Sequence, residues 1–305
     1  MSAVLPQAGV FQHSILAQVR LWWEMTRPRV LLLVLFTGLP VLGMTKEGWP
    51  SPWDASMVLL ATALAGAASS TLNAWAERDT DAKMARTRNR PLPAASVQPA
   101  HALIIGILLS LASTAMLWAL GGPLAATVGL GTILFYLFVY TLYLKPRTPQ
   151  NIVIGGAAGS TAPIIAEAAL TGEITAASVV LFLIVFLWTP PHFWAIAIFR
   201  KEEYAQAGFP MMPIVIGDRA TRRQSLAYTL ALVAVSLSLL PLGLAGWLYE
   251  VSALLAGVWF CAHVVRSMRA DDPAVDYSVF RVSIVYLFVL FGAMLLDLAL
   301  HRSFI

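Results

Sequence analysis

The chain has 305 residues, of which 59% are hydrophobic and 12% are charged, and its net charge is +4. Soluble domains carry about 25% charged residues, so this composition excludes a large water-soluble fold. The single cysteine, Cys261, excludes an internal disulfide and a cysteine-based metal site. We therefore expect an all-α, polytopic membrane protein, with a cytoplasmic N-terminal arm over residues 1–29 and one transmembrane domain over residues 30–305.

Nine apolar stretches follow one another along the chain, and a bilayer-spanning helix takes about 20 such residues. Gly121-Gly122-Pro123 divides the longest uncharged stretch in two, because Gly and Pro interrupt helices. The turns between several stretches are too short to hold a second folded domain. The predicted spans are 30–45, 55–76, 98–120, 123–144, 151–170, 174–199, 224–248, 251–266 and 282–300.

The placement of Lys and Arg predicts the orientation in the membrane. Of the 20 basic residues, only Lys46 and Arg302 fall on the side opposite to the others. Because basic residues collect on the cytoplasmic side, the N-terminus is expected inside and the C-terminus outside. The first 25 residues resemble neither a signal peptide nor a transit peptide, so a bacterial inner membrane is the expected location. The positive charge then reflects topology and indicates no nucleic-acid partner.

The end of the second predicted span carries a set of oxygen-bearing side chains. Asn73, Glu77 and Asp81 are spaced four residues apart, which places them within roughly 80° of each other on one helix face. Mg²⁺ takes a few carboxylates and completes its shell with substrate phosphates. A solvated, salt-bridged helix end is the alternative, but acids at a helix C-terminus oppose the macrodipole and polar groups in an apolar span are usually functional. A metal–phosphate site is therefore favoured.

A basic cluster follows these acids along the chain. Arg is a bidentate partner for phosphate oxygens, although the same residues also serve the positive-inside topology and are weaker indicators than the acids. The candidate diphosphate-binding residues in this connection are Lys83, Arg86, Arg88 and Arg90.

Several stretches resemble the UbiA-type intramembrane prenyltransferases. Asn73–Pro91 is similar to the first Asp-rich motif of that superfamily, and Thr87–Leu92 (TRNRPL) matches its basic tail. Within the superfamily, the likeness is greatest to the protohaem IX farnesyltransferase family. That likeness rests on Thr26–Val30 (TRPRV), Lys145–Gly159 (KPRTPQNIVIGGAAG), Trp188–Ala197 (WTPPHFWAIA) and Tyr204–Pro213 (YAQAGFPMMP).

The resemblance implies a helical-bundle enzyme that transfers a farnesyl group from farnesyl diphosphate to a vinyl group of haem B, with addition of water, giving haem O and pyrophosphate. It implies Asn73, Glu77 and Asp81 as the catalytic residues that hold Mg²⁺, with Glu77 replacing the superfamily's first aspartate. Lys145 and Arg147 are implied as further diphosphate donors. A downstream haem-modifying or oxidase-assembly protein is implied as a partner.

The second acidic motif departs from the superfamily pattern, because Arg200 and Tyr204 stand where carboxylates are expected. This departure leaves open whether a second Mg²⁺ binds. Arg200 and Lys201 are candidates for direct contact with the diphosphate, and Glu203 is the candidate for the remaining metal carboxylate. A charged interfacial loop is the alternative, above all for Glu202.

His192 lies in an apolar span after Pro191, and it is followed by Phe193 and Trp194. An intramembrane ionisable group is a functional candidate by default, and imidazole ligation suits haem; a hydrogen-bonded packing histidine is the alternative. His192, Phe193 and Trp194 are the candidate haem-binding residues, and Pro191 is expected to kink the helix.

Two other acids, Glu167 and Asp297, lie near the predicted outer helix ends and are expected at solvated interface positions.

Two other functions share part of this pattern. Another prenyltransferase of the same superfamily, acting on an aromatic acid or a quinone precursor, would carry the same motif and topology. A transporter of an anionic amphiphile would place polar groups near the bilayer midplane. Here the charged residues collect at one membrane face, which disfavours transport.

Overall fold

The computed structural model describes residues 15–45 and 48–301, and this part of the chain is helical and contains no strand. Lys46, Arg302 and the first half of the predicted N-terminal arm lie outside the described residues. The elements are α1 (Ile15–Met25), α2 (Pro28–Gly43), α3 (Pro52–Asp81), α4 (Pro99–Leu134), the π-helix η1 (Phe135–Leu144), α5 (Asn151–Gly159), α6 (Ala162–Thr171), α7 (Ala176–Phe199), α8 (Lys201–Gln206), α9 (Met212–Val215), α10 (Asp218–Ser236), α11 (Trp247–Ala270) and α12 (Pro273–His301).

The polytopic helical fold predicted from the sequence is confirmed. Within the described residues, six helical segments are long and apolar enough to cross a membrane, and there are seven if α1 and α2, bent by 56°, form one span. The count of nine stays a prediction. The 16-residue α2 is short, α10 begins with charged residues, and α4 with η1 counts as a single segment.

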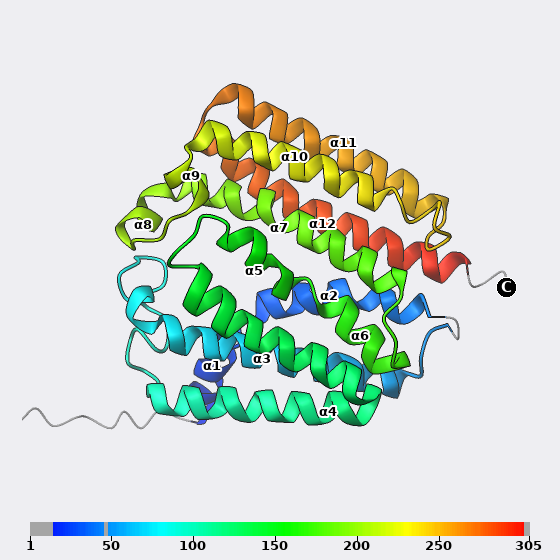
Figure 1. Ribbon diagram of the computed structural model, residues 1–305, viewed down its shortest axis with the longest axis horizontal. Coiled ribbons are helices and arrows are strands. Elements are labelled where there is room, and N and C mark those ends of the chain that lie inside the picture. The colour runs from blue at the N-terminus through cyan, green and yellow to red at the C-terminus, as the bar shows by residue number, and fades with distance from the viewer. Residues whose placement is uncertain (1–14, 46–47, 302–305) are drawn as a thin grey trace, which may run out of the picture.

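That single segment folds back on itself within α4, at Gly121 and Gly122 (Figure 1). Gly122 has φ 67° and ψ −156°, a backbone conformation that is sterically unfavourable for any residue with a Cβ atom. The two halves of α4 are antiparallel, because Gly129 lies against the Leu117 side chain. This turn lies at the Gly-Gly-Pro sequence that divides the third and fourth predicted spans.

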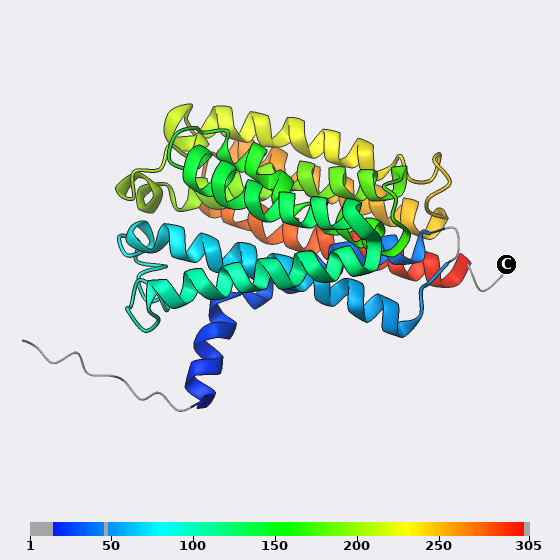
Figure 2. The ribbon, with the colours of Figure 1, turned by 60° about the horizontal axis from the view of Figure 1, so that its bottom comes forward.

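The long connections meet at one end of the bundle. Figures 1 and 2 show residues 82–98 and the short helices α8 and α9 at the same end, whereas the turns 172–175 and 237–246 lie at the other. The charged connections therefore share one end, as the placement of basic residues predicts.

The interior is close-packed around α7, which contacts α10, α12, α5 and α6. Trp194, Phe260 and Tyr286 are fully buried there. Large apolar side chains such as Leu111 and Leu255 are exposed on the outside, at 62% and 65%. Exposed apolar surface of this extent marks a surface that contacts lipid.

Two predicted interface acids are instead buried helix caps. Glu167, 3% exposed, accepts hydrogen bonds from the backbone N–H of Thr175 (2.8 Å) and from the Ser178 hydroxyl at the start of α7. Asp297, 2% exposed, accepts from the backbone N–H groups of Gly246 and Tyr249 at the start of α11. The expectation of solvated positions is wrong, because these carboxylates satisfy the unpaired N–H groups and the positive dipole of a helix N-terminus.

Candidate functional site

The last two turns of α3 carry the predicted acidic set on one buried face. Asn73, Glu77 and Asp81 are 1%, 6% and 6% exposed. Asp79 points away from them, with 84% of its side chain exposed and Arg78 at 3.6 Å. The i, i+4, i+8 spacing thus brings three oxygen-bearing side chains together and leaves the intervening acid in solvent.

Asn73 is held by two groups from distant parts of the chain. Its Oδ1 accepts a hydrogen bond from Nη2 of Arg27 (2.7 Å), and its Nδ2 donates to the hydroxyl of Thr141 in η1 (3.0 Å). Arg27 occupies the bend between α1 and α2 in a left-handed conformation with φ 53°, which costs an L-residue roughly 1–2 kcal/mol. This backbone places the guanidinium against α3.

Glu77 is paired with Lys145 from the connection after η1. Nζ of Lys145 donates to Oε1 of Glu77, and the side chains are only 18% and 7% exposed. Nζ also lies 4.9 Å from the ring centroid of Phe209, a distance suited to a cation–π contact. Lys145 therefore lies against the predicted acidic set, and its role as a diphosphate donor stays a prediction.

Asp81 is paired with Arg90 in the connection that follows α3. Nη1 of Arg90 donates to Oδ2 of Asp81 at 2.8 Å, and the Thr87 hydroxyl donates to the Asp81 carbonyl at 2.7 Å. Burial, reinforced by repulsion from Arg27 and Arg86, lowers the pKa of Arg90 although Asp81 opposes that shift. Arg90 is thus the guanidinium bonded to the Asp81 carboxylate, and an additional anion would relieve its repulsion from Arg27 and Arg86.

The other predicted diphosphate donors in these two connections do not contact the acidic set. Lys83, Arg86 and Arg88 are exposed on the connection. Arg147 turns onto the end of η1, where its Nη1 donates to the carbonyls of Leu142 (2.7 Å) and Tyr143 (3.1 Å). Because Arg147 is exposed and bonded to backbone, it does not contact the α3 acids.

The second predicted motif forms its own ion pairs at α8. Arg200 donates to Oε1 of Glu203 at 3.0 Å, and Lys201 donates to Asp218 at 2.8 Å. In the described part of the chain, no three Asp, Glu, His or Cys side chains are close enough to share a metal. Glu203 therefore does not join Glu77 and Asp81 in one cage, although its Oε2 is buried without a hydrogen-bond partner.

Tyr204 of α8 lies between these two groups of charges. Burial raises the pKa of its phenol above the usual range, against the attraction of Arg86 and Arg200. The hydroxyl therefore stays protonated at physiological pH and is a hydrogen-bond donor.

The chemistry of the α3 acids suits a divalent cation. In each carboxylate one oxygen accepts a hydrogen bond, Oε1 in Glu77 and Oδ2 in Asp81. Among the described residues, neither second oxygen is both buried and without a hydrogen-bond partner. Mg²⁺ prefers hard oxygen donors of this kind. It is usually bound by one or two carboxylates, and substrate phosphates complete its coordination shell. Asn73, Glu77 and Asp81 are the residues that would hold it.

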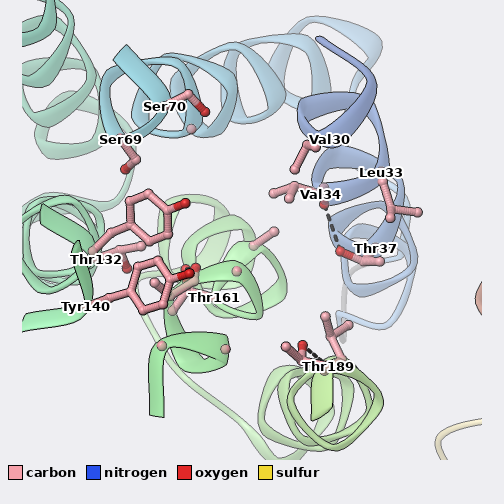
Figure 3. Close-up of a pocket in the computed structure, with 18 of the residues that line it drawn as sticks. Val30, Leu33, Val34, Thr37, Ser69, Ser70, Thr132, Tyr140, Thr161 and Thr189 are labelled. Carbon is pink, nitrogen blue, oxygen red and sulfur yellow. Dashed lines mark hydrogen bonds between the residues drawn. The ribbon is translucent and has the colours of Figure 1, made fainter. Parts of the chain in front are cut away.

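A cavity of about 260 Å³ lies beside this site, between α2, α3, η1, α5, α6 and α7 (Figure 3). Its wall is mostly apolar, with Val30, Val34 and Ile165 among the lining residues. Hydroxyls of Ser69 and Ser70, one turn before Asn73, and the phenol of Tyr140 also reach it. An apolar space that ends at a charged site matches an amphiphile with an anionic head.

His192 lines the same cavity from α7. Its Nδ1 is bonded to the Ser283 hydroxyl at 2.7 Å, and its ring stacks on Trp188 at 4.1 Å and against Phe280 at 4.7 Å. Nε2 forms no hydrogen bond with the described residues, and it is not fully buried. The ring is thus fixed with Nε2 accessible from the cavity.

The two neighbours of His192 have different environments. Phe193 lines the cavity and is 41% exposed. Trp194 is fully buried outside the cavity, beside Met211 and Tyr228, whose ring lies 5.5 Å away. Contrary to the expectation, Trp194 is a packing residue, because adjacent helical positions point about 100° apart.

The prolines of α7 do not divide the helix. α7 continues as one α-helix through Pro190 and Pro191. Gly155 and Gly156 of α5 line the cavity and allow close packing there, because a Cβ on Gly155 would overlap the Tyr140 ring. A Cβ on Gly156 would lie 2.9 Å from the Thr189 side chain.

Sequence reasoning assigned no role to Arg27, Thr141, Trp188 or Ser283. Arg27 lies in the TRPRV segment that carries the resemblance, which was the available signal. Thr141 and Ser283 gave none, because a hydroxyl in an apolar span usually bonds its own helix backbone.

Comparison with known proteins identifies relatives over almost the whole chain. The model described as the UbiA prenyltransferase family matches residues 33–293. A protein named protoheme IX farnesyltransferase from Acidiphilium cryptum is 42% identical, over 97% of this chain and 96% of its own. One of the same name from Alkalilimnicola ehrlichii is 43% identical, over 96% of each.

Solved structures share the fold at low sequence identity. A digeranylgeranylglyceryl phosphate synthase superposes with a TM-score of 0.78 at 14% identity, covering 92% of this chain and 98% of its own. A UbiA homolog from Archaeoglobus fulgidus bound to DMAPP and Mg²⁺ gives 0.62 at 17% identity, covering 90% and 98%.

Proposed function

The chain belongs to the UbiA prenyltransferase family, and we propose that it transfers a farnesyl group from farnesyl diphosphate to a vinyl group of haem B. Water adds in the same reaction, and the products are haem O and pyrophosphate. The observation that carries this proposal is the buried Glu77–Asp81 face with its paired cations, which lies on the same helix as Ser69 and Ser70 in the wall of an apolar cavity that His192 lines. Membership in an enzyme family sets the transporter alternative aside.

The cations of the site neutralise the diphosphate. In the structure Lys145 and Arg90 are paired with Glu77 and Asp81. When Asn73, Glu77 and Asp81 hold Mg²⁺, the ion supplies Lewis-acid stabilisation of the charge on the leaving pyrophosphate. Lys145 and Arg90 would then have diphosphate oxygens as partners in place of carboxylates, and Arg27, which is bonded to the Asn73 amide oxygen, would add a further donor.

The cavity holds the prenyl chain and excludes water from it. Breaking the bond between C1 and the diphosphate oxygen leaves an allylic cation, and the electron pair departs with pyrophosphate. The phenol ring of Tyr140 and the ring of Phe193 line the cavity, and aromatic faces attract a cation within about 6 Å. Dry apolar walls keep bulk water from capturing the cation early.

The acceptor is placed from the α7 side. The π electrons of a haem vinyl group form the new carbon–carbon bond, and water then captures the resulting cation beside the porphyrin with loss of a proton. His192 presents Nε2 to this region, while Trp188 and Ser283 fix its ring. We infer that His192 contacts haem, because imidazole is a common axial ligand of haem iron.

The orientation follows from the charged end of the bundle. We propose that this end is cytoplasmic in a bacterial inner membrane, with the N-terminus inside, because basic residues favour that side. Farnesyl diphosphate and haem B would then reach the site from the cytoplasmic leaflet.

The reaction is tested by incubating membranes that contain the chain with haem B, farnesyl diphosphate and Mg²⁺, and measuring product masses. The expected product is haem carrying the farnesyl group and one water, formed in no reaction that contains a chelator of Mg²⁺. The control replaces haem with 4-hydroxybenzoate, the acceptor chemistry of the competing prenyltransferase. A prenylated aromatic acid with no modified haem would assign the chain to the other branch of the family.

A further inference from the structure

A second cleft lies far from the proposed active site, between α10 and α11. It measures about 220 Å³ and is lined by Arg219, Arg223 and Arg269 around a floor of Leu226, Val265 and Met268. Figure 1 shows α10 and α11 at the edge of the bundle, away from α2 and α3. The arginines belong to the start of α10 and the end of α11, so the cleft lies at the charged end.

Three acids at this end of the bundle are already in ion pairs. Asp276 and Asp271 are paired with the buried Arg222, with 2.6 Å between Nη2 of Arg222 and Oδ2 of Asp276. Asp218 is paired with Lys201. Arg219, Arg223 and Arg269 have no ion-pair partner among the described residues. Among the described residues, no carboxylate lies within ion-pair distance of these three guanidiniums.

The surroundings of the cleft are those of a lipid-facing surface. Leu230 of α10 and Leu255 and Val258 of α11 are 56%, 65% and 61% exposed. Arginines at the end of such helices lie at headgroup depth, where basic pockets between membrane helices bind anionic lipid headgroups. The apolar floor formed by Leu226, Val265 and Met268 suits the first carbons of an acyl chain.

We propose that this cleft is a binding site for an anionic phospholipid, whose phosphate is held by Arg219, Arg223 and Arg269. A guanidinium donates two parallel N–H bonds to two oxygens of a phosphate. The acyl chains lie along the exposed apolar face of α10 and α11. The site is independent of the prenyl-transfer site, because it shares no lining residue with the central cavity.

The test uses the full chain in detergent, titrated with phosphatidylglycerol and with phosphatidylcholine, and counts retained lipids by native mass spectrometry. Removing one phosphate-contacting Arg is worth about 1 kcal/mol, or roughly a five-fold loss of affinity. Arg219→Gln, Arg223→Gln and Arg269→Gln are each expected to lower phosphatidylglycerol retention by about that factor. Arg266→Gln is the matched control, because Arg266 is exposed on α11 but does not line the cleft.

The outcomes separate the lipid site from its alternatives. Equal loss in Arg266→Gln would overturn the proposal in favour of diffuse charge attraction. Competition by millimolar inorganic phosphate would overturn it in favour of a free-anion site. Unchanged thermal unfolding of the variants, which leave the Arg222–Asp276 pair intact, shows that a loss of lipid reflects the cleft and not the fold.

Discussion

Replacing Lys145 with Met removes the cation that neutralises Glu77. Only 7% of the Glu77 side chain is exposed, so its charge would remain in a poorly solvated position. Removing one partner of a buried pair costs about 3–5 kcal/mol, and the 18% exposure of Lys145 places this pair near the lower limit, about 3 kcal/mol. At about 2–4 °C per kcal/mol, Lys145→Met should lower Tm by roughly 6–12 °C.

The double variant Glu77→Gln/Lys145→Met separates the pair from the packing around it. It removes both charges and should recover most of the lost Tm, because no buried ion then lacks a partner. Arg147→Met is the matched control. Arg147 is exposed, bonds backbone carbonyls at the end of η1 and lies over the Tyr143 ring, so its loss should cost about 1 kcal/mol.

The assay is thermal unfolding of the purified protein, followed by tryptophan fluorescence, with and without Mg²⁺. Mg²⁺ should raise the Tm of Lys145→Met more than that of the double variant, because only the former retains the Glu77 carboxylate. Two results would refute the reasoning: equal loss in Lys145→Met and Arg147→Met, or a double variant no more stable than Lys145→Met.

Three further predictions concern activity and topology. Asp81→Asn should lower kcat at least about 100-fold while leaving haem binding near normal, since it weakens charge stabilisation in the transition state; prenyl transfer at limiting Mg²⁺ measures this. Cysteines at the exposed positions Ala85 and Glu202, in a Cys261→Ser background, should react with an impermeant thiol reagent in inverted vesicles and resist it in intact cells. His192→Ala should raise KM for haem B or change the bound haem's spectrum, with the affinity for farnesyl diphosphate unchanged.

Each of these predictions has a contrary outcome. Asp79→Asn is the control for Asp81, because Asp79 is exposed beyond the buried face; equal loss in both would point to overall charge. Thiol labelling in intact cells at either position would place that connection outside. Weakened diphosphate binding in the His192 variant, with an unchanged haem spectrum, would assign His192 to the prenyl donor.

Local spacing predicted the acidic face of α3, because helical periodicity alone places Asn73, Glu77 and Asp81 together. It did not predict their partners. Glu77 and Lys145 are 68 residues apart, and Arg27 reaches Asn73 only through a left-handed residue at a bend. Such pairings depend on how the helices pack against each other, and this packing cannot be predicted from local spacing or composition.

The assignment of Trp194 failed for a related reason. The α7 sequence is apolar on every side, so it offers no amphipathic pattern that separates a cavity face from a packed face. Phe193 and Trp194 were equivalent in the sequence, and only the positions of α5 and α9 distinguish them. The role of His192 was predictable as a candidate because an ionisable group in such a helix stands out.

The carboxylates of Glu167 and Asp297 make the two ends of the bundle differ in their attraction for anions. A helix N-terminus attracts negative charge, and α7 and α11 both begin at the end opposite to the charged connections. At that end each helix already holds a protein carboxylate on its first N–H groups. A substrate with an anionic head therefore finds both helix N-termini occupied at that end, whereas the cations paired with Glu77 and Asp81 lie at the other.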